Sequence, residues 1–281
     1  MPRMSGITPS KASDSSSAAL RAFAILETLV RADRPLAMSE ICEAHALPKP
    51  TVFRVLATLE AAGLVAREPA DKRYSAGPRL SELGLAIMTN QSSRRVRRAI
   101  LQRIADETEE TCNLTAVDGI DVVYLDRVES RWPLRVDLSP GSRVPLHCSA
   151  SGKLFLSRLP SAKRRTLLQS LPLKAYTERT IVDIDALAAE LDRIRATGVG
   201  TDNEEYLAGL VCVAVPVVDR SDRHIATIAL QAPSVRFPLE RAMECVPLLR
   251  RAAATMATTF DLQANAASDA VAHRASAPAA S

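Results

Sequence analysis

No stretch of the sequence reaches the roughly 20 consecutive apolar residues that a membrane-spanning helix needs. Residues 1–17 lack the apolar segment of a secretory signal, so we expect them to form a disordered lead. The five cysteines are scattered, odd in number and without CxxC spacing, which argues against a disulfide framework and a zinc site. These absences favour a cytoplasmic protein that has no membrane partner, and we expect no metal or other cofactor.

Aromatic residues are also scarce, at 4%, although 47% of the residues are hydrophobic. A chain of 281 residues is long enough to bury two cores. The net charge of +4 is unevenly distributed: residues 1–105 hold 16 Lys and Arg against 9 Asp and Glu, and the remainder holds 20 against 23. A basic first third joined to a weakly acidic body is typical of a nucleic-acid-binding domain attached to a different module.

The segment 18–78 has the element order of a winged helix-turn-helix. Apolar residues recur at helical spacing from Leu20 to Val30. A short helix over 39–45, with Ser39 as its cap, and a turn precede a third helix that Pro50 and Thr51 open. Two short strands, at 64–67 and 73–75, then flank a turn. We therefore predict a DNA-binding domain over these residues.

The third helix is expected to enter a major groove, because it is apolar behind and carries Arg54 in front. Its N-terminus and the tip of the following hairpin would contact phosphates or the minor groove. Phe53 lies one residue past the apolar face and is expected to pack on a thymine methyl or a sugar. The predicted DNA-binding residues are Ser39, Lys49, Thr51, Phe53, Arg54, Lys72 and Arg73. The alternative is a winged helix that serves protein interaction or dimerisation.

The rest of the chain is predicted to form a linker helix over 79–92 and a second domain over 93–263. A hairpin is expected from 113–117 and 122–127, because two apolar runs flank a turn with Gly119. The further predicted elements are a strand at 134–138, helices from 149–152 onward and over 183–196, strands at 211–218 and 225–230, a final helix over 239–262 and a disordered tail over 264–281. We assign no role to the basic cluster Arg94, Arg95, Arg97 and Arg98.

From Leu20 to Leu262 the sequence resembles the IclR family of bacterial transcription regulators. Its N-terminal part carries this resemblance in 47–56, Leu59, Gly63, Leu64 and 74–77. Two more specific motifs follow at 144–153 (Val-Pro-Leu-His-Cys-Ser-Ala-Ser-Gly-Lys) and at 202–217, which begins Asp-Asn-Glu-Glu-Tyr.

The resemblance implies an α+β protein, with a winged helix-turn-helix, a linker helix and a GAF-like effector-binding domain built on an antiparallel sheet. It also implies homodimers or tetramers (dimers of dimers) on palindromic double-stranded operator DNA, with a small carboxylic acid or aromatic catabolite as effector. The effector-binding residues that it implies are Val136, Val144, Ala150, Ser151, Asp202, Leu210, Cys212, Ala229 and Gln231.

A helix that opens with small residues at 149–152 supports this placement, because its free backbone N–H groups and its dipole attract a carboxylate. Members that respond to glyoxylate or pyruvate carry small hydroxyl residues where this chain has Ala229 and Gln231. We therefore expect a somewhat larger, partly apolar carboxylate.

Other chemistries for the same residues are less favoured. Cys148 and Cys212 are more often buried apolar residues than redox sensors, and Asp202 with Glu204 and Glu205 has no nearby histidine to complete a metal site. His147 beside Ser149 lacks a GxSxG elbow. We predict a ligand-responsive DNA-binding regulator that is not an enzyme. A constitutive regulator with a vestigial pocket and a small-molecule enzyme with a dimerising winged helix are the alternatives.

Overall fold

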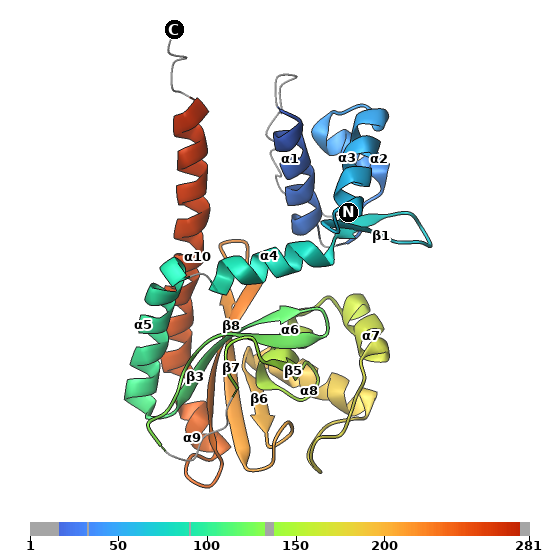
Figure 1. Cartoon of the computed structure of the whole chain (residues 1–281). Coiled ribbons are helices and arrows are strands. Elements are labelled where there is room, and N and C mark those ends of the chain that lie inside the picture. Colours follow the sequence, from blue (N-terminus) through green and yellow to red (C-terminus); the bar gives the residue numbers. More distant parts are fainter. Residues whose placement is uncertain (1–16, 33, 90, 133–137, 276–281) are drawn as a thin grey trace. The chain divides into compact units, whose positions relative to one another are not determined.

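The computed structural model describes residues 17–32, 34–89, 91–132 and 138–275. The chain divides into two compact units, residues 1–87 and 88–281, and mixes helices with antiparallel strands (Figure 1). None of the helices within the described ranges is long and apolar enough to cross a membrane.

The first unit is a winged helix-turn-helix, as the sequence predicts. Its elements are α1 (Ala18–Arg31), α2 (Met38–His45), α3 (Lys49–Ala61), β1 (Val65–Arg67), β2 (Tyr74–Ala76) and α4 (Pro78–Thr89) up to residue 87, where the unit ends. Strands β1 and β2 pair antiparallel, and Leu36 adds a bridge to Tyr74 on the outer side of the hairpin. The three helices enclose a core of Ile25, Leu29, Ile41, Val52, Leu56 and Tyr74, all less than 5% exposed.

The capping of α2 differs from the prediction. The helix begins at Met38, so Ser39 lies inside its first turn and does not cap it. The Glu40 carboxylate accepts the backbone N–H of Ala37 at 2.8 Å and thereby satisfies a donor at the start of the helix. A glutamate at the third position of a helix can accept this N–H even when the residue just before the helix, here Ala37, has no polar side chain.

The second unit is a six-stranded antiparallel sheet between two layers of helices. Its strands are β3 (Thr111–Asp118), β4 (Asp121–Val128), β5 (Arg143–Pro145), β6 (Gly200–Asn203), β7 (Leu210–Val218) and β8 (His224–Pro233), in the order β5-β4-β3-β8-β7-β6. One face carries α6 (Ala150–Arg158), with α8 (Ile184–Thr197) against it, and α7 (Ser161–Ser170) follows α6. The other face carries α5 (Gln91–Thr108), α9 (Leu239–Glu244) and α10 (Val246–Ala275) (Figure 1).

The elements of this unit largely match the expected ones. The β3–β4 hairpin, α6, α8, and the long strands β7 and β8 all form where the sequence predicts them. Helix α8 begins one residue later than predicted, at Ile184, because Asp183 is its cap. The predicted strand at 134–138 falls, except for Leu138, outside the described residues. The predicted final helix is divided at Cys245, because Pro247 has no N–H and can stand only in the first turn of a new helix.

The composition of segment 264–281 predicts disorder, but α10 continues to Ala275. Alanine has the highest helix propensity of all residues, and the tail is rich in it. A segment whose composition cannot form a core can therefore still extend an existing helix, since extension does not require a new nucleation step.

A row of small residues brings α6 close to the sheet. Ala229 on β8 pairs with Ala214 on β7, which pairs with Gly200 on β6. A Cβ atom on Gly200 would lie 2.2 Å from the carbonyl oxygen of Ala150, so any larger residue would push α6 away. This close approach places the first turn of α6 directly over the strands.

Candidate functional site

Helix α3 presents a polar surface on the side opposite its core. Val52, Leu56 and Leu59 are buried, while Lys49 and Arg54 are exposed and Phe53 is 54% exposed. Within the described residues, the Arg54 side chain has no hydrogen bond or ion pair. A free arginine beside an exposed aromatic ring on one helix face is the arrangement that the sequence predicts for contact with base edges.

The N-terminus of α3 offers fewer phosphate donors than expected. Pro50 has no N–H, and the N–H groups of Thr51 and Val52 both donate to the carbonyl of Pro48, at 2.9 and 3.1 Å. The backbone N–H of Lys49 is left as the open donor within this described turn. A phosphate at this end would therefore rely on the Lys49 side chain and on the Thr51 hydroxyl.

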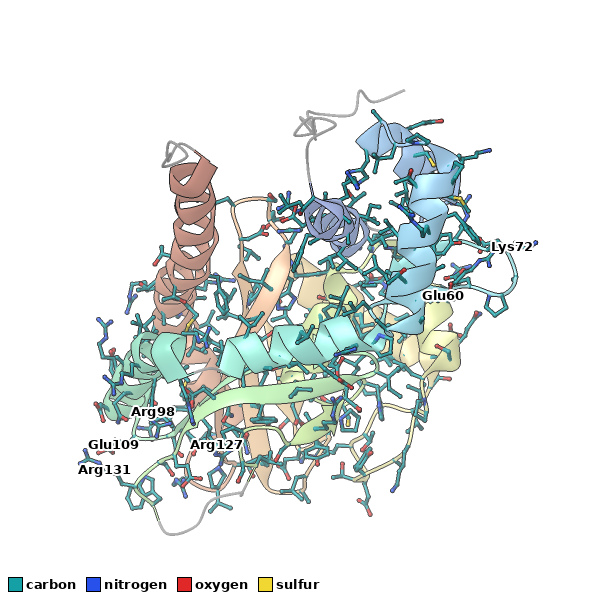
Figure 2. All side chains as sticks on the ribbon, turned by 45° about the horizontal axis from the view of Figure 1, so that its top comes forward. Glu60, Lys72, Arg98, Glu109, Arg127 and Arg131 are labelled. Atoms are coloured by element: carbon teal, nitrogen blue, oxygen red, sulfur yellow. The ribbon has the colours of Figure 1, made fainter. Side chains whose placement is uncertain are left out.

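The hairpin separates the two basic residues that the sequence places at its tip. Lys72 stands at the turn with φ +57° and points outward (Figure 2). Arg73 turns inward: it pairs with Glu40 at 3.1 Å and with Asp71 at 3.0 Å. Hydrogen bonding from Arg34, which also contacts Glu40, lowers the pKa of that carboxyl to about 2. Arg73 thus fastens the hairpin to α2, whereas Lys72 is exposed at the turn.

The second unit brings the expected effector residues around one cavity. Its lining contains eight of the nine, namely Val144, Ala150, Ser151, Asp202, Leu210, Cys212, Ala229 and Gln231. Val136 lies outside the described residues. The lining also contains Val122, Tyr124, Leu138, Ser149 and Tyr206, which were not singled out. The alternation of Val122 and Tyr124 along the predicted strand was the available signal for two of these.

Three side chains form a line across the sheet below α6. Gln231 on β8 is directly opposite Cys212 on β7, and Cys212 is directly opposite Asp202 on β6. Directly opposite residues on neighbouring strands point to the same face. The cavity floor therefore presents an amide, a thiol and a carboxyl group in one row.

The first turn of α6 forms the opposite wall. The Ser149 hydroxyl caps the helix by accepting from the Gly152 N–H at 3.3 Å, and it donates to the Pro145 carbonyl at 2.6 Å. Lys153 N–H donates to the Ser149 carbonyl. The N–H groups of Ala150 and Ser151 remain as the open donors of this described turn, and both residues are at most 6% exposed. Such a pair of buried donors at a helix N-terminus is suited to an anion.

The carboxyl group in the floor has unusual electrostatics. Burial raises the pKa of Asp202 to about 7, although its Oδ1 accepts the N–H groups of Glu205 at 2.7 Å and Tyr206 at 3.3 Å. Burial also raises the pKa of the Cys212 thiol well above its ordinary value and that of Cys148 to about 12. The thiols are therefore protonated near neutral pH, which disfavours redox sensing through a thiolate.

Two segments hold the loop that follows β6 in place. The Lys153 ammonium, which is fully buried, pairs with Glu205 and lies 3.4 Å from Glu190 on α8. The hydroxyls of Thr177 and Thr180 donate to the carbonyls of Glu204 and Glu205, at 2.7 and 2.6 Å. The loop over the cavity is thus tied both to α6 and to the segment that precedes α8.

The cavity is small. Its volume is about 20 Å³, whereas one water molecule needs about 10–15 Å³ on this scale. A molecule with several non-hydrogen atoms can enter only if lining side chains move.

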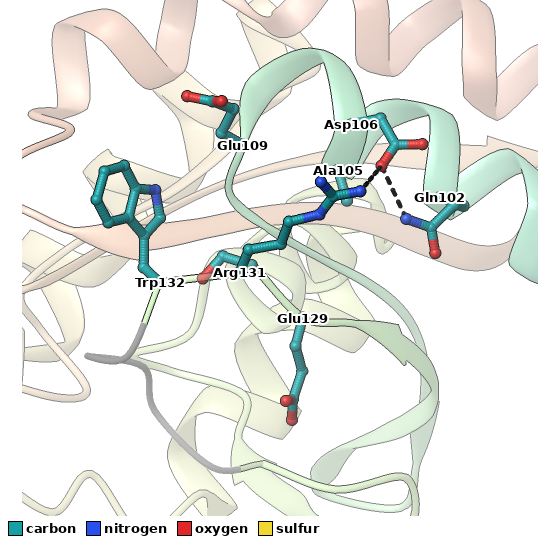
Figure 3. Close-up of a pocket in the computed structure, with 8 residues that line it drawn as sticks. Gln102, Ala105, Asp106, Glu109, Glu129, Arg131 and Trp132 are labelled. Atoms are coloured by element: carbon teal, nitrogen blue, oxygen red, sulfur yellow. Dashed lines mark hydrogen bonds and ion pairs between the residues drawn. The ribbon is translucent and has the colours of Figure 1, made fainter.

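A larger hollow of about 370 Å³ lies beside α5 (Figure 3). Asp106, Glu109 and Glu129 line it, with Arg131 as the basic residue, and Asp106 contacts Gln102 at 2.9 Å and Arg131 at 4.0 Å. Its net negative lining does not suit a carboxylate.

The basic cluster at the start of α5 is engaged within its own unit. Arg94 and Arg98 both donate to the buried carboxylate of Asp126, at 3.1 and 3.2 Å. Arg97 is 1% exposed, and its guanidinium lies over the Phe260 ring at 5.3 Å. Arg94 and Arg98 thus fasten α5 to β4, and Arg97 contacts α10.

Comparisons with known proteins agree with this architecture. The family described as "IclR helix-turn-helix domain" matches residues 18–69, and the family "Bacterial transcriptional regulator IclR C-terminal" matches residues 86–258. The chain is 48% identical to the probable transcriptional regulator SauR of Cupriavidus necator over 246 residues, which cover 88% of this chain and 98% of that protein.

Solved structures give the same result. The IclR of Thermotoga maritima superposes with a TM-score of 0.57 at 30% identity, covering 85% of this chain and 97% of that one. The inducer-binding domain of a PobR double mutant from Acinetobacter, solved with 3-hydroxybenzoic acid, gives a TM-score of 0.54 at 27% identity and covers 58% of this chain and 96% of that one. The chain belongs to the IclR family of transcriptional regulators, with an N-terminal helix-turn-helix DNA-binding domain and a C-terminal effector domain.

Proposed function

We propose that this regulator binds operator DNA as a homodimer, or as a dimer of dimers, and that a small carboxylic acid in the cavity controls its affinity for DNA. The observation that carries the proposal is that two kinds of polar group line the same cavity. Two buried N–H donors, on Ala150 and Ser151, lie on one wall, and the polar row of Gln231, Cys212 and Asp202 lies on the floor. In this arrangement the helix N-terminus binds the carboxylate of the effector, and the row recognises its other end.

The size of the cavity narrows the class of effector. An apolar cavity that holds benzene has a volume of about 150 Å³. This is several times the volume of the cavity that Tyr206 lines. The 3-hydroxybenzoic acid bound to the PobR domain is nevertheless an aromatic carboxylic acid in a related fold. We propose an effector closer in size to a two- to four-carbon acid, which revises the larger acid expected from Ala229 and Gln231, and we keep aromatic acids as a comparison set.

The loop that follows β6 is the element through which the acid acts. It contributes Tyr206 to the lining next to Asp202, the third residue of β6, and Lys153, Thr177 and Thr180 hold it. An acid that enlarges the cavity by shifting this loop favours one of two arrangements of the unit. The acid changes DNA affinity only as far as it binds these arrangements with different affinity.

Dimer formation is supported by an apolar stripe on α1. Leu20, Phe23 and Val30 are between 58% and 67% exposed and fall on one side of the helix. Exposed apolar residues that repeat at helical spacing are typical of a helix that packs on a partner. A second copy of this chain is the proposed partner, since palindromic operators require a two-fold symmetric regulator.

A thermal-shift screen of small and aromatic carboxylic acids tests the proposal. We expect at least one two- to four-carbon acid to raise the melting temperature of the full chain, and the variant Ser149→Ala to weaken that effect because the cap of α6 is lost. No stabilisation by any acid would favour a constitutive regulator with a vestigial cavity. Turnover of a bound acid would favour the enzyme alternative.

A further inference from the structure

A network of buried hydrogen bonds runs from Arg127 on β4 to the cavity floor. Arg127 Nη1 donates to Asn113 Oδ1 at 3.4 Å, and Asn113 Nδ2 donates to Gln231 Oε1 at 3.1 Å. The Tyr124 hydroxyl donates to the same Oε1 at 3.5 Å. Arg127, Asn113 and Gln231 are all at most 4% exposed, so bulk water does not compete for these hydrogen bonds.

The donor-to-acceptor direction of these hydrogen bonds follows from Arg127. A guanidinium can only donate hydrogen bonds, so Arg127 requires the oxygen of the Asn113 amide to face it. The NH₂ group of Asn113 must then face β8, and it requires the oxygen of Gln231. A reversed Gln231 amide would place two NH₂ groups against each other and leave a buried donor unsatisfied, which is unfavourable because the group has already lost its hydration.

The NH₂ group of Gln231 is what remains for the cavity. Gln231 lines the cavity, its oxygen already accepts from two donors, and no group among the described residues accepts from its Nε2. We infer that Arg127 and Asn113 are positioning residues that fix Gln231 as a donor, so that the effector must present a hydrogen-bond acceptor to the cavity floor.

This inference rests on the proposed function and makes the effector class narrower. The acid is bound by donors at both ends: the N–H groups of Ala150 and Ser151 hold one carboxylate, and Gln231 binds a second acceptor oxygen. Below pH 7, where the neighbouring Asp202 carboxyl group is neutral, an acid whose far end carries only donors, such as an ammonium group, is rejected because that group would face the NH₂ of Gln231. Asn113 is absent from the described cavity lining, so it determines this preference without touching the effector.

The variant Asn113→Asp tests the inference, because a carboxylate at this position can only accept. The new carboxylate pairs with Arg127 and turns Gln231, whose NH₂ then faces that carboxylate and whose oxygen faces the cavity. The probes are malonate, with an acceptor at its far end, and β-alanine, with a donor there. Calorimetry is done below pH 7, where Asp202 in the same row is neutral and does not pair with an ammonium group. We expect it to show that the wild type prefers malonate by about tenfold or more and that the order is reversed in the variant.

Asn203→Asp is the matched control. Asn203 is exposed, and its oxygen also accepts from an arginine at 3.4 Å, from Arg179, so the substitution adds the same charge next to the same kind of partner. It should leave the order of the probes unchanged. Gln231→Glu is a second route to an acceptor in the floor and should also reverse the order, which keeps the test valid if Asn113→Asp folds poorly.

The orientation of Gln231 can also be read without a ligand. In the wild type, the side-chain NH₂ signal that Gln231→Glu removes should show nuclear Overhauser contacts to cavity-lining side chains, and these should be lost in Asn113→Asp. If acids bind but the order of the probes is the same in the wild type and in Asn113→Asp, the inference is wrong while the proposed function stands. If neither probe nor any other acid binds the wild type, both are wrong.

Discussion

The buried ammonium of Lys153 on α6 donates to the carboxylate of Glu205 in the loop after β6. The two residues belong to the two motifs that are most specific in the sequence, at 144–153 and 202–217. The pair therefore joins the helix that forms one wall of the cavity to the loop that follows Asp202 and β6. Neither residue belongs to the described lining of the cavity itself.

Replacing Lys153 by methionine should destabilise the second unit strongly. The substitution leaves the Glu205 carboxylate buried without its cation, which costs about 3–5 kcal/mol. We expect the melting temperature to fall by about 10 °C in a thermal scan. The double variant Lys153→Met with Glu205→Gln should recover most of this loss, and Lys163→Met, at an exposed lysine of α7, should have no effect. A double variant as unstable as the single one would contradict the assigned pairing.

DNA affinity should depend on Arg54 and Lys72 in different ways. Arg54→Ala is expected to weaken binding to the operator by about 1–3 kcal/mol and to relax base preference, because a base-edge contact is lost. Lys72→Ala should weaken binding to all DNA sequences. It should also reduce the slope of log affinity against log salt concentration by about one, the amount expected for one phosphate contact. Arg195→Ala removes an exposed charge from α8 and serves as the control. Equal losses for Arg195→Ala and Arg54→Ala would refute a specific role for α3.

The two exposed phenylalanines of the first unit should have separable roles. Phe23 is 67% exposed on α1 and Phe53 is 54% exposed on α3. Phe23→Asp is expected to shift the oligomer toward monomers in analytical ultracentrifugation, because a charge then stands in the apolar stripe of α1. Phe53→Ala should leave the oligomer unchanged and weaken only DNA binding. An unchanged assembly in Phe23→Asp would show that the stripe is not the interface.

Effector affinity should decrease as the pH rises through about 7. Burial raises the pKa of Asp202 to about 7, so below this pH the neutral carboxyl group can donate to an anionic acid, and above it the carboxylate repels the acid. The dissociation constant should rise by up to about tenfold per pH unit above 7, with proton uptake on binding. Calorimetry at acidic, neutral and alkaline pH in two buffers measures both quantities.

The same pKa shift predicts how the stability of the unliganded protein depends on pH. The unfolded chain releases the Asp202 proton near the ordinary value of 3.8 and the folded chain near 7, so the contribution of Asp202 to the free energy of unfolding falls between these pH values. Glu205 and Lys153, which lie close to it, shift its titration in opposite directions. Asp202→Asn should remove both pH effects, and a variant that keeps the wild-type pH profile would show that another group titrates.

Helices α1, α3, α6 and α8, the hairpins and most of the cavity lining could be predicted from the sequence, because each depends on local pattern or on a motif. Helix α7 and the short strands β5 and β6 were not predicted. Apolar spacing located α1 and α3, and the motif at 144–153 located Ala150 and Ser151. The inward turn of Arg73 could not be predicted in this way, since it depends on Glu40, which is 33 residues away. Sequence spacing assigned equal weight to Lys72 and Arg73, and only the packing of the hairpin on α2 separates them.

The size of the cavity and the direction of Gln231 could not be predicted from the sequence either. The size of the amide at position 231 suggested a larger effector, but it does not reveal that Asn113, which lies 118 residues away in the sequence, holds the side chain. Hydrogen bonds between strands that are far apart in the sequence decide which atom of such a side chain faces the cavity. Residue identity alone therefore indicated the site but not the chemistry that it presents.

Operator binding in the presence of the effector tests the central claim most directly. Fluorescence anisotropy should be measured with a labelled DNA fragment from upstream of the gene for this protein, while the acid that raises the melting temperature most is titrated. We predict a change in DNA affinity of about five- to 150-fold at saturating acid, as expected for allosteric coupling of about 1–3 kcal/mol. Unchanged affinity with every acid that binds would contradict the account.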